Sequence, residues 1–151
     1  MISVIIATKN DEARLGRAMA SLVTAAVDAL VTEVIVADAG STDATLAVAD
    51  DAGAKIVRGS IDDAVKAAKG PWLLILPAAA GLSHGWEEAV AAHANGAGGP
   101  ARIGVAGGLW ARLTRGRRLD EGLLIERALY ERIGGWSRAR GRGRRLGYLN
   151  V

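Results

Sequence analysis

Residues 33–45 read EVIVADAGSTDAT, and this stretch carries the clearest signal of the fold class. An apolar run with β-branched residues, Glu33–Asp38, predicts a strand that is buried on both faces. A Gly-Ser-Thr turn follows, in which Ser41 or Thr42 is placed to cap a helix. The stretch therefore predicts a strand, a turn and a helix in direct succession, as in α/β proteins.

The same alternation extends on both sides of this stretch. Short apolar strands are predicted at Ile2–Ala7, Lys55–Val57 and Trp72–Leu76, with helices starting at Asn10 or Asp11 and spanning Ile61–Lys69. Strands that alternate with helices predict an α/β domain with a mostly parallel sheet. Ligands of such sheets bind beyond the carboxyl ends of the strands, so the turns after Ala7, Asp38 and Leu76 are expected to line one site.

The composition fits one globular domain. The chain has 151 residues, of which 50% are hydrophobic and 23% charged, and it has no cysteine, which excludes disulfides and thiolate metal sites. The sequence shows neither a signal peptide nor an apolar run of about 20 residues. We therefore expect a cytoplasmic protein without a transmembrane segment.

The net charge of +3 hides a division between the two ends of the chain. Residues 1–100 carry seven basic and twelve acidic side chains, whereas residues 101–151 carry twelve arginines and four acids. Residues 137–151 are expected to form an Arg/Gly-rich tail after a domain of residues 1–136. Such a tail suggests an anionic partner, which could be phosphate, an acidic membrane surface or nucleic acid; the alternative is a solvated terminus. The arginines concerned are Arg138, Arg140, Arg142, Arg144 and Arg145.

Two groups of polar residues are candidates for a binding site. Asp38 closes an apolar strand before the Gly-Ser-Thr turn, where a carboxylate could accept a base N–H or ribose hydroxyls; alternatively it only caps the turn. Thr8, Asn10 and Asp11 follow the first strand at the same edge, although they also form a plausible helix start. His84 and His93 are too isolated to predict a metal site.

Four ordered blocks resemble family 2 glycosyltransferases, and in particular a compact bacterial subgroup. They are SVIIATKNDEARLGRAMASL (3–22), EVIVADAGSTDAT (33–45), KGPWLLILPAAAGLSHGW (69–86) and LDEGLLIERALYERIGGW (119–136). The resemblance implies a GT-A fold, a Rossmann-like three-layer sandwich. It also implies a nucleotide-sugar donor, usually linked to UDP or GDP, and a divalent Mg or Mn ion.

The resemblance also assigns roles to individual residues. Thr8 and Asp11 would line the nucleoside pocket and Asp38 would contact the base, while Asn10 and Ser41 are expected to complete the nucleotide site. Asp120 and Glu121 match the segment that approaches the acceptor, and one of them would serve as the catalytic base.

Two departures from the family pattern leave the activity open. The family holds its metal with an Asp-x-Asp or His-Ala-Asp motif, but Ala79 stands in place of the key aspartate, so no metal ligand is predicted. The acidic pair that usually follows the last block is missing, because no acid follows Glu131. The chain is therefore expected to be a sugar transferase in which the arginines clamp phosphate. Alternatively, it is an inactive nucleotide-binding or protein-interaction module, or an anion-binding protein.

Overall fold

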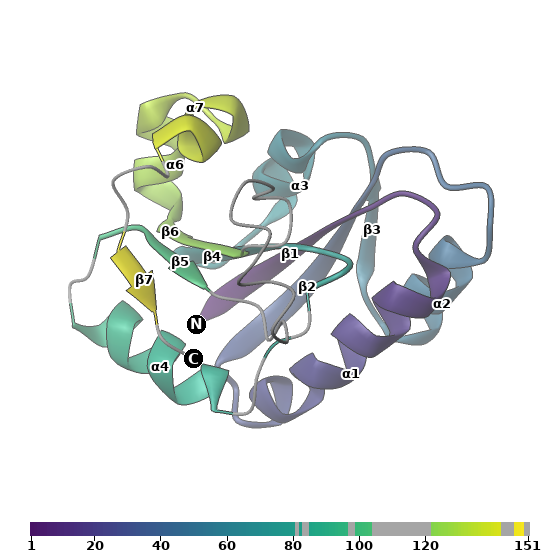
Figure 1. Ribbon diagram of the computed structural model, residues 1–151, viewed down its shortest axis with the longest axis horizontal. Coiled ribbons are helices and arrows are strands. Elements are labelled where there is room, and N and C mark those ends of the chain that lie inside the picture. Colours follow the sequence, from purple (N-terminus) through teal and green to yellow (C-terminus); the bar gives the residue numbers. More distant parts are fainter. Residues whose placement is uncertain (81, 83–84, 97–98, 104–121, 143–146, 150–151) are drawn as a thin grey trace, which may run out of the picture.

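The computed structural model describes residues 1–80, 82, 85–96, 99–103, 122–142 and 147–149 (Figure 1). Of residues 140–142 and 147–149 it describes the backbone only. Its sheet has seven strands in the order β3-β2-β1-β4-β6-β5-β7. The strands are β1 (Ile2–Thr8), β2 (Val31–Asp38), β3 (Lys55–Arg58), β4 (Trp72–Pro77), β5 (Ala101–Ile103), β6 (Gly122–Glu126) and β7 (Gly147–Leu149).

The sheet is mostly parallel. Strands β3, β2, β1 and β4 run in one direction, β6 is antiparallel to both β4 and β5, and β7 is parallel to β5. The prediction of a mostly parallel α/β sheet is confirmed. The antiparallel strand β6 was not predicted from local pattern.

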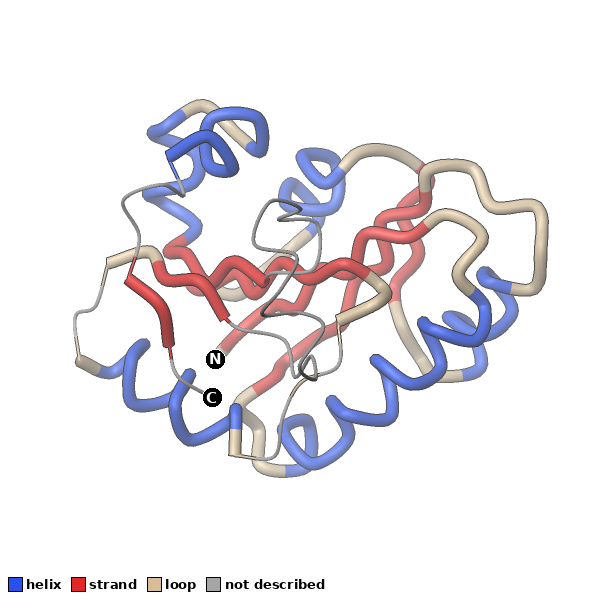
Figure 2. Tube along the Cα trace, viewed as in Figure 1, coloured by secondary structure: helices blue, strands red, loops and turns tan. Residues whose placement is uncertain are grey.

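Helices cover both faces of the sheet, which makes three layers (Figure 2). One face carries α1, α2 and α4, and the other carries α3, α6 and α7 (Figure 1). The helices are α1 (Glu12–Val27), α2 (Thr45–Asp51), α3 (Ile61–Ala67), α4 (Trp86–Asn95), α6 (Arg127–Ile133) and α7 (Trp136–Arg142).

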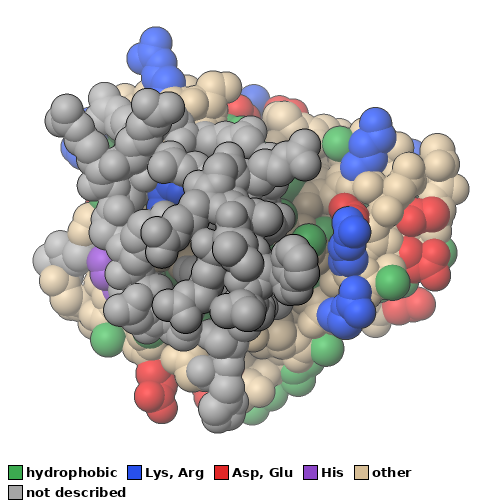
Figure 3. Space-filling model, viewed as in Figure 1, with side chains coloured by type: hydrophobic (Ala, Val, Ile, Leu, Met, Phe, Trp, Pro, Cys, Tyr) green, Lys and Arg blue, Asp and Glu red, His purple; other side chains and the backbone are tan. Residues whose placement is uncertain are grey.

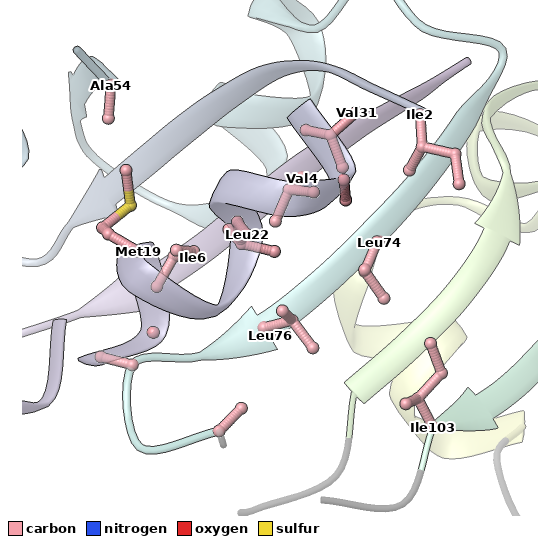
Figure 4. Packing of buried hydrophobic residues seen from close by; sticks show 14 of the residues in the cluster. Ile2, Val4, Ile6, Met19, Leu22, Val31, Ala54, Leu74, Leu76 and Ile103 are labelled. Carbon is pink, nitrogen blue, oxygen red and sulfur yellow. The ribbon is translucent and has the colours of Figure 1, made fainter. Parts of the chain in front are cut away.

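The two helix layers explain why the central strands are apolar along their whole length. Val4 and Ile6 of β1 pack in the core under α1, whereas Ile5 between them packs in the core on the opposite face. Figure 4 shows Met19 and Leu22 of α1 above this first core. Each core residue removes apolar surface from water, which is the main force that holds the three layers together.

Helix boundaries differ from the predictions in two details. Helix α3 ends at Ala67, because Ala68 already has an extended backbone (ψ 146°). The N-cap of α2 is Ala44, not Ser41 or Thr42. Helix α2 begins at Thr45, so Ser41 and Thr42 both lie before its N-cap, and the Ser41 hydroxyl donates to Asp38, as described below.

The arginine-rich end of the chain is partly built into the fold. Ala139 of α7 is buried in the core beside α3 and α6, and Gly147–Leu149 pairs with β5 at the edge of the sheet. These contacts argue against a fully solvated terminus. The functional boundary at residue 136 stays a prediction. Within the described residues, no helix is both long and apolar enough to cross a membrane.

A partly buried contact fixes the start of α7. The hydroxyl of Tyr130 donates to Asp62 Oδ1 at 2.7 Å, and the backbone N–H of Trp136 donates to the same oxygen at 2.9 Å. Burial and the neighbouring carboxylate both raise the pKa of Tyr130, so the hydroxyl stays protonated and available as a donor. The first turn of α3 is thereby joined to α6 and α7.

Candidate functional site

The candidate site lies at the carboxyl ends of three parallel strands. Thr8 of β1 is the register partner of Asp38 on β2, and Asp38 is the partner of Arg58 on β3. Aligned residues of neighbouring strands point to the same face, here the face that carries α1 and α2. On the other side of β1, the N–H of Ala78 donates to Ala7 O at 3.0 Å. The predicted turns therefore meet at one edge, as expected.

Asp38 is the most strongly bonded residue of the site. Its side chain is 2% exposed, and its carboxylate accepts from the N–H groups of Gly40 and Ser41 at 3.1 Å and from the Ser41 hydroxyl. Burial alone raises the pKa of this carboxylate. The hydrogen bonds from Ser41 and Gly40 and the charge of Arg58 lower it by more than burial raises it, so the pKa of Asp38 lies below its ordinary range. Asp38 therefore caps the turn as an ionised group, while its contact with a base stays a prediction.

Asn10 joins the turn after β1 to the turn after β2. Its backbone N–H donates to Ser41 Oγ at 2.9 Å, and its side-chain Oδ1 accepts from the N–H of Thr42 at 2.8 Å. Asn10 has a φ of 54°, in the left-handed region that asparagine tolerates better than most residues. This backbone geometry lets one residue bind the opposite turn with both its main chain and its side chain.

A second link between the turns involves residues that the sequence did not single out. The N–H of Asp11 donates to Thr45 Oγ1 at 2.9 Å, and the N–H of Glu12 donates to Asp43 Oδ2 at 3.4 Å. Thr45 is fully buried, and its hydroxyl donates to Asp43 Oδ1. The signal available for these residues was the polar run STDAT at 41–45, just before the helix.

Thr8 differs from its neighbours in having an unused polar atom. Its side chain is 5% exposed, and its hydroxyl has no hydrogen-bond partner among the described residues. A buried hydroxyl without a partner costs free energy. Such a group at the predicted nucleotide site is what a bound ligand would satisfy.

The turn after β4 offers no side-chain oxygen. Ala78 and Ala80 are each 2% exposed and pack in the core, while Ala79 between them is exposed at the edge of the sheet. Among the described residues, no group of three or more His, Cys, Asp or Glu side chains could hold a metal ion. The residues that the structure describes here therefore do not fit the Mg or Mn ion that the family resemblance implies.

The remaining predicted residues are only partly described. Arg138 is exposed on α7, but nothing is described of the side chains of Arg140 and Arg142. Asp120 and Glu121, the predicted catalytic residues, lie outside the described residues, as do Arg144 and Arg145. Basic and acidic side chains are mixed at the end of the molecule where α1 and α2 lie (Figure 3).

Comparison with known proteins agrees with this arrangement. The family model for glycosyl transferase family 2 matches residues 3–94, more than half of the chain. The chain belongs to glycosyl transferase family 2. An uncharacterized glycosyltransferase of Rickettsia felis (strain ATCC VR-1525 / URRWXCal2) is 48% identical over 56 residues, which are 37% of this chain. The match covers only 18% of the length of that relative.

Solved structures show the same fold. Glucosyl-3-phosphoglycerate synthase from Mycobacterium tuberculosis, in complex with Mn²⁺, UDP and glucosyl-3-phosphoglycerate, superimposes with a TM-score of 0.66 at 23% identity. The alignment covers 100% of this chain and 70% of that enzyme. The complex of the same enzyme with Mn²⁺, UDP-glucose and phosphoglyceric acid gives a TM-score of 0.66 at 22% identity, with the same coverage. The predicted GT-A-like fold is thereby confirmed.

Proposed function

We propose that this domain binds a nucleotide-diphosphate sugar at the edge formed by β1, β2 and β4 and transfers the sugar to an acceptor. The observation that carries the proposal is the pair of Thr8 and Asp38 at adjacent strand ends, where a buried hydroxyl that bonds to none of the described residues lies beside an ionised carboxylate. A nucleoside offers both donors and acceptors to such a pair.

The nucleoside would be held by residues from both interlocked turns. In this proposal Thr8 and Asp11 line the nucleoside pocket and Asp38 accepts from the base, while Asn10 and Ser41 hold the turns in place. The mycobacterial synthase that shares the fold was solved with UDP and with UDP-glucose. This favours UDP among the donors to be tested first.

The proposed reaction is a direct displacement with inversion at the sugar. An acceptor hydroxyl attacks the anomeric carbon, the bond from that carbon to the phosphate oxygen breaks, and the nucleoside diphosphate leaves. The proton of the hydroxyl passes to a base, for which Asp120 or Glu121 is the candidate. The exposed turn at Ala79 offers no side-chain oxygen to a metal, so we propose that arginines neutralise the leaving diphosphate.

The arginines proposed for this role are the five between residues 138 and 145. Arg138 is exposed on α7, whose first residue is bonded to Asp62 near the carboxyl end of β3. Because Ala139 is buried and β7 completes the sheet edge, substitution is a cleaner test than truncation. Sugar transfer that is unchanged after all five arginines are replaced by glutamine would contradict this role.

A second candidate function is a nucleotide-binding or protein-interaction module without catalysis. The specific observation in its favour is that Ala78, Ala79 and Ala80 form the turn where the family resemblance implies a metal-binding carboxylate. A module of this kind would keep the Thr8–Asp38 pair and bind the nucleotide without turning over the sugar donor.

Calorimetry with UDP-, GDP- and dTDP-sugars, with and without Mn²⁺, tests both candidates. Binding together with release of the nucleoside diphosphate in the presence of acceptors supports the transferase. Binding without turnover supports the nucleotide-binding module. The absence of binding by every donor would contradict both the transferase and the nucleotide-binding module and would favour a protein-interaction role. We also propose a cytoplasmic location, with the arginines available to an acidic membrane surface; sedimentation with vesicles that contain anionic lipid tests the latter.

A further inference from the structure

We propose that Asp62 is a positioning residue that holds Arg138 beside the nucleotide site, so that it supports binding of the diphosphate without touching it. This inference rests on the proposed function and names a residue outside the nucleotide pocket that the site requires.

The chain runs from the site to Asp62 within a few residues after β3. Strand β3 ends at Arg58, the register partner of Asp38, and the N–H of the next residue, Gly59, donates to Asp38 O at 3.0 Å. Helix α3 begins at Ile61, directly after its cap Ser60. Asp62 therefore lies in the first turn of α3, three residues after Gly59, which is bonded to the main chain of Asp38.

Two hydrogen bonds to Asp62 bring α7 to the start of α3. Asp62 Oδ1 accepts from the Tyr130 hydroxyl at 2.7 Å and from the Trp136 N–H at 2.9 Å, across at least 68 residues of sequence. Trp136 is the first residue of α7, and an N–H in the first turn of a helix has no partner within that helix. Asp62 supplies the missing acceptor, so the start of α7 is bound to the start of α3.

A pair of glycines, Gly134 and Gly135, makes this contact possible. Gly134 and Gly135 have φ values of 90° and 88°, in the left-handed region that favours glycine. A Cβ on Gly135 would lie 2.6 Å from Asp62 Oδ1, too close for any other residue without movement. A Cβ on Gly134 would lie 3.3 Å from Arg138 Cδ, which shows that the Arg138 side chain runs back along the glycine pair. The stem of Arg138 therefore lies against Gly134, two residues before Trp136, whose N–H donates to Asp62.

Arg138 differs from several basic residues on other helices in its ion pairing. Arg14, Lys66 and Arg127 each form a salt bridge within their own helix. Among the described residues, Arg138 has no such partner and its side chain is exposed. An exposed guanidinium with free donors that is held in place by its helix is suited to bind phosphate oxygens.

Uridine and UDP binding to the full chain separate positioning from general support of the fold. We expect Asp62→Ala and Arg138→Gln each to weaken UDP binding about tenfold and to leave uridine binding unchanged. The double variant should bind UDP no more weakly than either single variant, because Asp62 acts through Arg138. Asp62→Asn keeps an oxygen that accepts both hydrogen bonds and should retain UDP affinity within about twofold. Asp63→Ala, the same loss of charge on the next residue, is the matched control and should leave UDP affinity unchanged.

Three results would overturn the inference while wild-type protein still binds UDP. They are an Asp62→Ala variant with unchanged UDP affinity, an equal loss of uridine and UDP binding in that variant, and losses that add in the double variant. A wild-type protein that binds neither uridine nor UDP overturns the proposed function and the inference together. The unfolding midpoint of each variant, measured in parallel, confirms that the comparison is made between folded proteins.

Discussion

Thr8 and Asp38 are register partners at the ends of adjacent parallel strands, yet their side chains are bonded very differently. The Asp38 carboxylate accepts hydrogen bonds from Gly40 and Ser41, whereas the Thr8 hydroxyl is buried and has no partner among the described residues. The two residues are therefore expected to respond in opposite ways to substitution. Loss of Asp38 would release a turn, while loss of the Thr8 hydroxyl would remove a group that bonds to none of the described residues.

Thr8→Val tests this expectation. The substitution keeps the shape of the side chain and removes a buried polar atom without a partner, so the free energy of unfolding should stay the same or rise by up to about 1 kcal/mol. Uridine binding should weaken about tenfold if the hydroxyl contacts the nucleoside. Urea denaturation and calorimetry measure the two effects. Thr8→Ser keeps the hydroxyl and is the control for binding, and a loss of stability above about 1 kcal/mol in Thr8→Val would reveal a structural partner.

Ala79→Asp and Ala80→Asp form a matched pair at the turn after β4. Ala79 is exposed, so an aspartate there should change the free energy of unfolding by no more than about 0.5 kcal/mol. Ala80 is 2% exposed in the core, so a carboxylate there should cost about 3 kcal/mol or more. We further expect UDP binding by Ala79→Asp to become stronger when Mn²⁺ is added. Binding that does not respond to Mn²⁺ would show that one carboxylate at this turn is not sufficient to hold the metal.

Tyr130→Phe removes one of the two hydrogen bonds that Asp62 Oδ1 accepts. We expect a loss of about 1–2 kcal/mol in the free energy of unfolding at neutral pH. The folded protein raises the pKa of Tyr130, so its contribution is present below the unfolded pKa of about 10 and is lost as the pH rises above that value. The gap in stability between wild type and Tyr130→Phe, measured by urea denaturation, should therefore narrow above pH ~10. A gap that stays constant in alkali would contradict this linkage.

Asp63 is expected to lose its contribution to stability in acid, whereas Tyr130 loses its contribution in alkali. Its carboxylate accepts from the hydroxyl of Ser60 at 2.6 Å and from the Ser60 N–H at 3.0 Å, and these hydrogen bonds lower the pKa of Asp63 to about 2. The contribution to stability is present above the ordinary carboxyl pKa and is lost as the pH falls through about 2. Asp63→Asn should be less stable than wild type at pH 7, and the two proteins should converge in urea denaturation towards pH ~2. Equal stability of the two at pH 7 would show that the cap contributes nothing to α3.

The parallel half of the fold was predictable because its signals are local. Each of β1 to β4 is a short apolar run followed by a turn, and the predicted strands agree with the observed ones within two residues. Strand β6 is also a short apolar segment. Its place beside β4 depends on pairing between Leu74 and Leu124, which are far apart in the sequence. No local pattern specifies such a partner, so the antiparallel part of the sheet was not predicted.

The site shows the same division between local and distant information. That Thr8, Asn10 and Asp38 would share an edge follows from the direction of parallel strands, and the structure confirms it. Which atoms bond across that edge does not follow from local pattern. Ser41 was expected to cap α2, but it bonds to Asp38 and accepts from Asn10 instead, because the first turn lies within reach of the second. The bonds of Asp62 to Tyr130 and Trp136 depend on tertiary structure in the same way.

The interlock between the turns after β1 and β2 has a consequence for how fast and how tightly a ligand can bind. Asn10 is bonded to Ser41 and Thr42, and Asp11 is bonded to Thr45, so the fold itself holds the two turns together. Loops that must be ordered by their ligand lose conformational entropy on binding, and this loss weakens affinity. In the proposed function, these hydrogen bonds order both turns during folding, so binding of a small nucleotide would lose less conformational entropy at this edge.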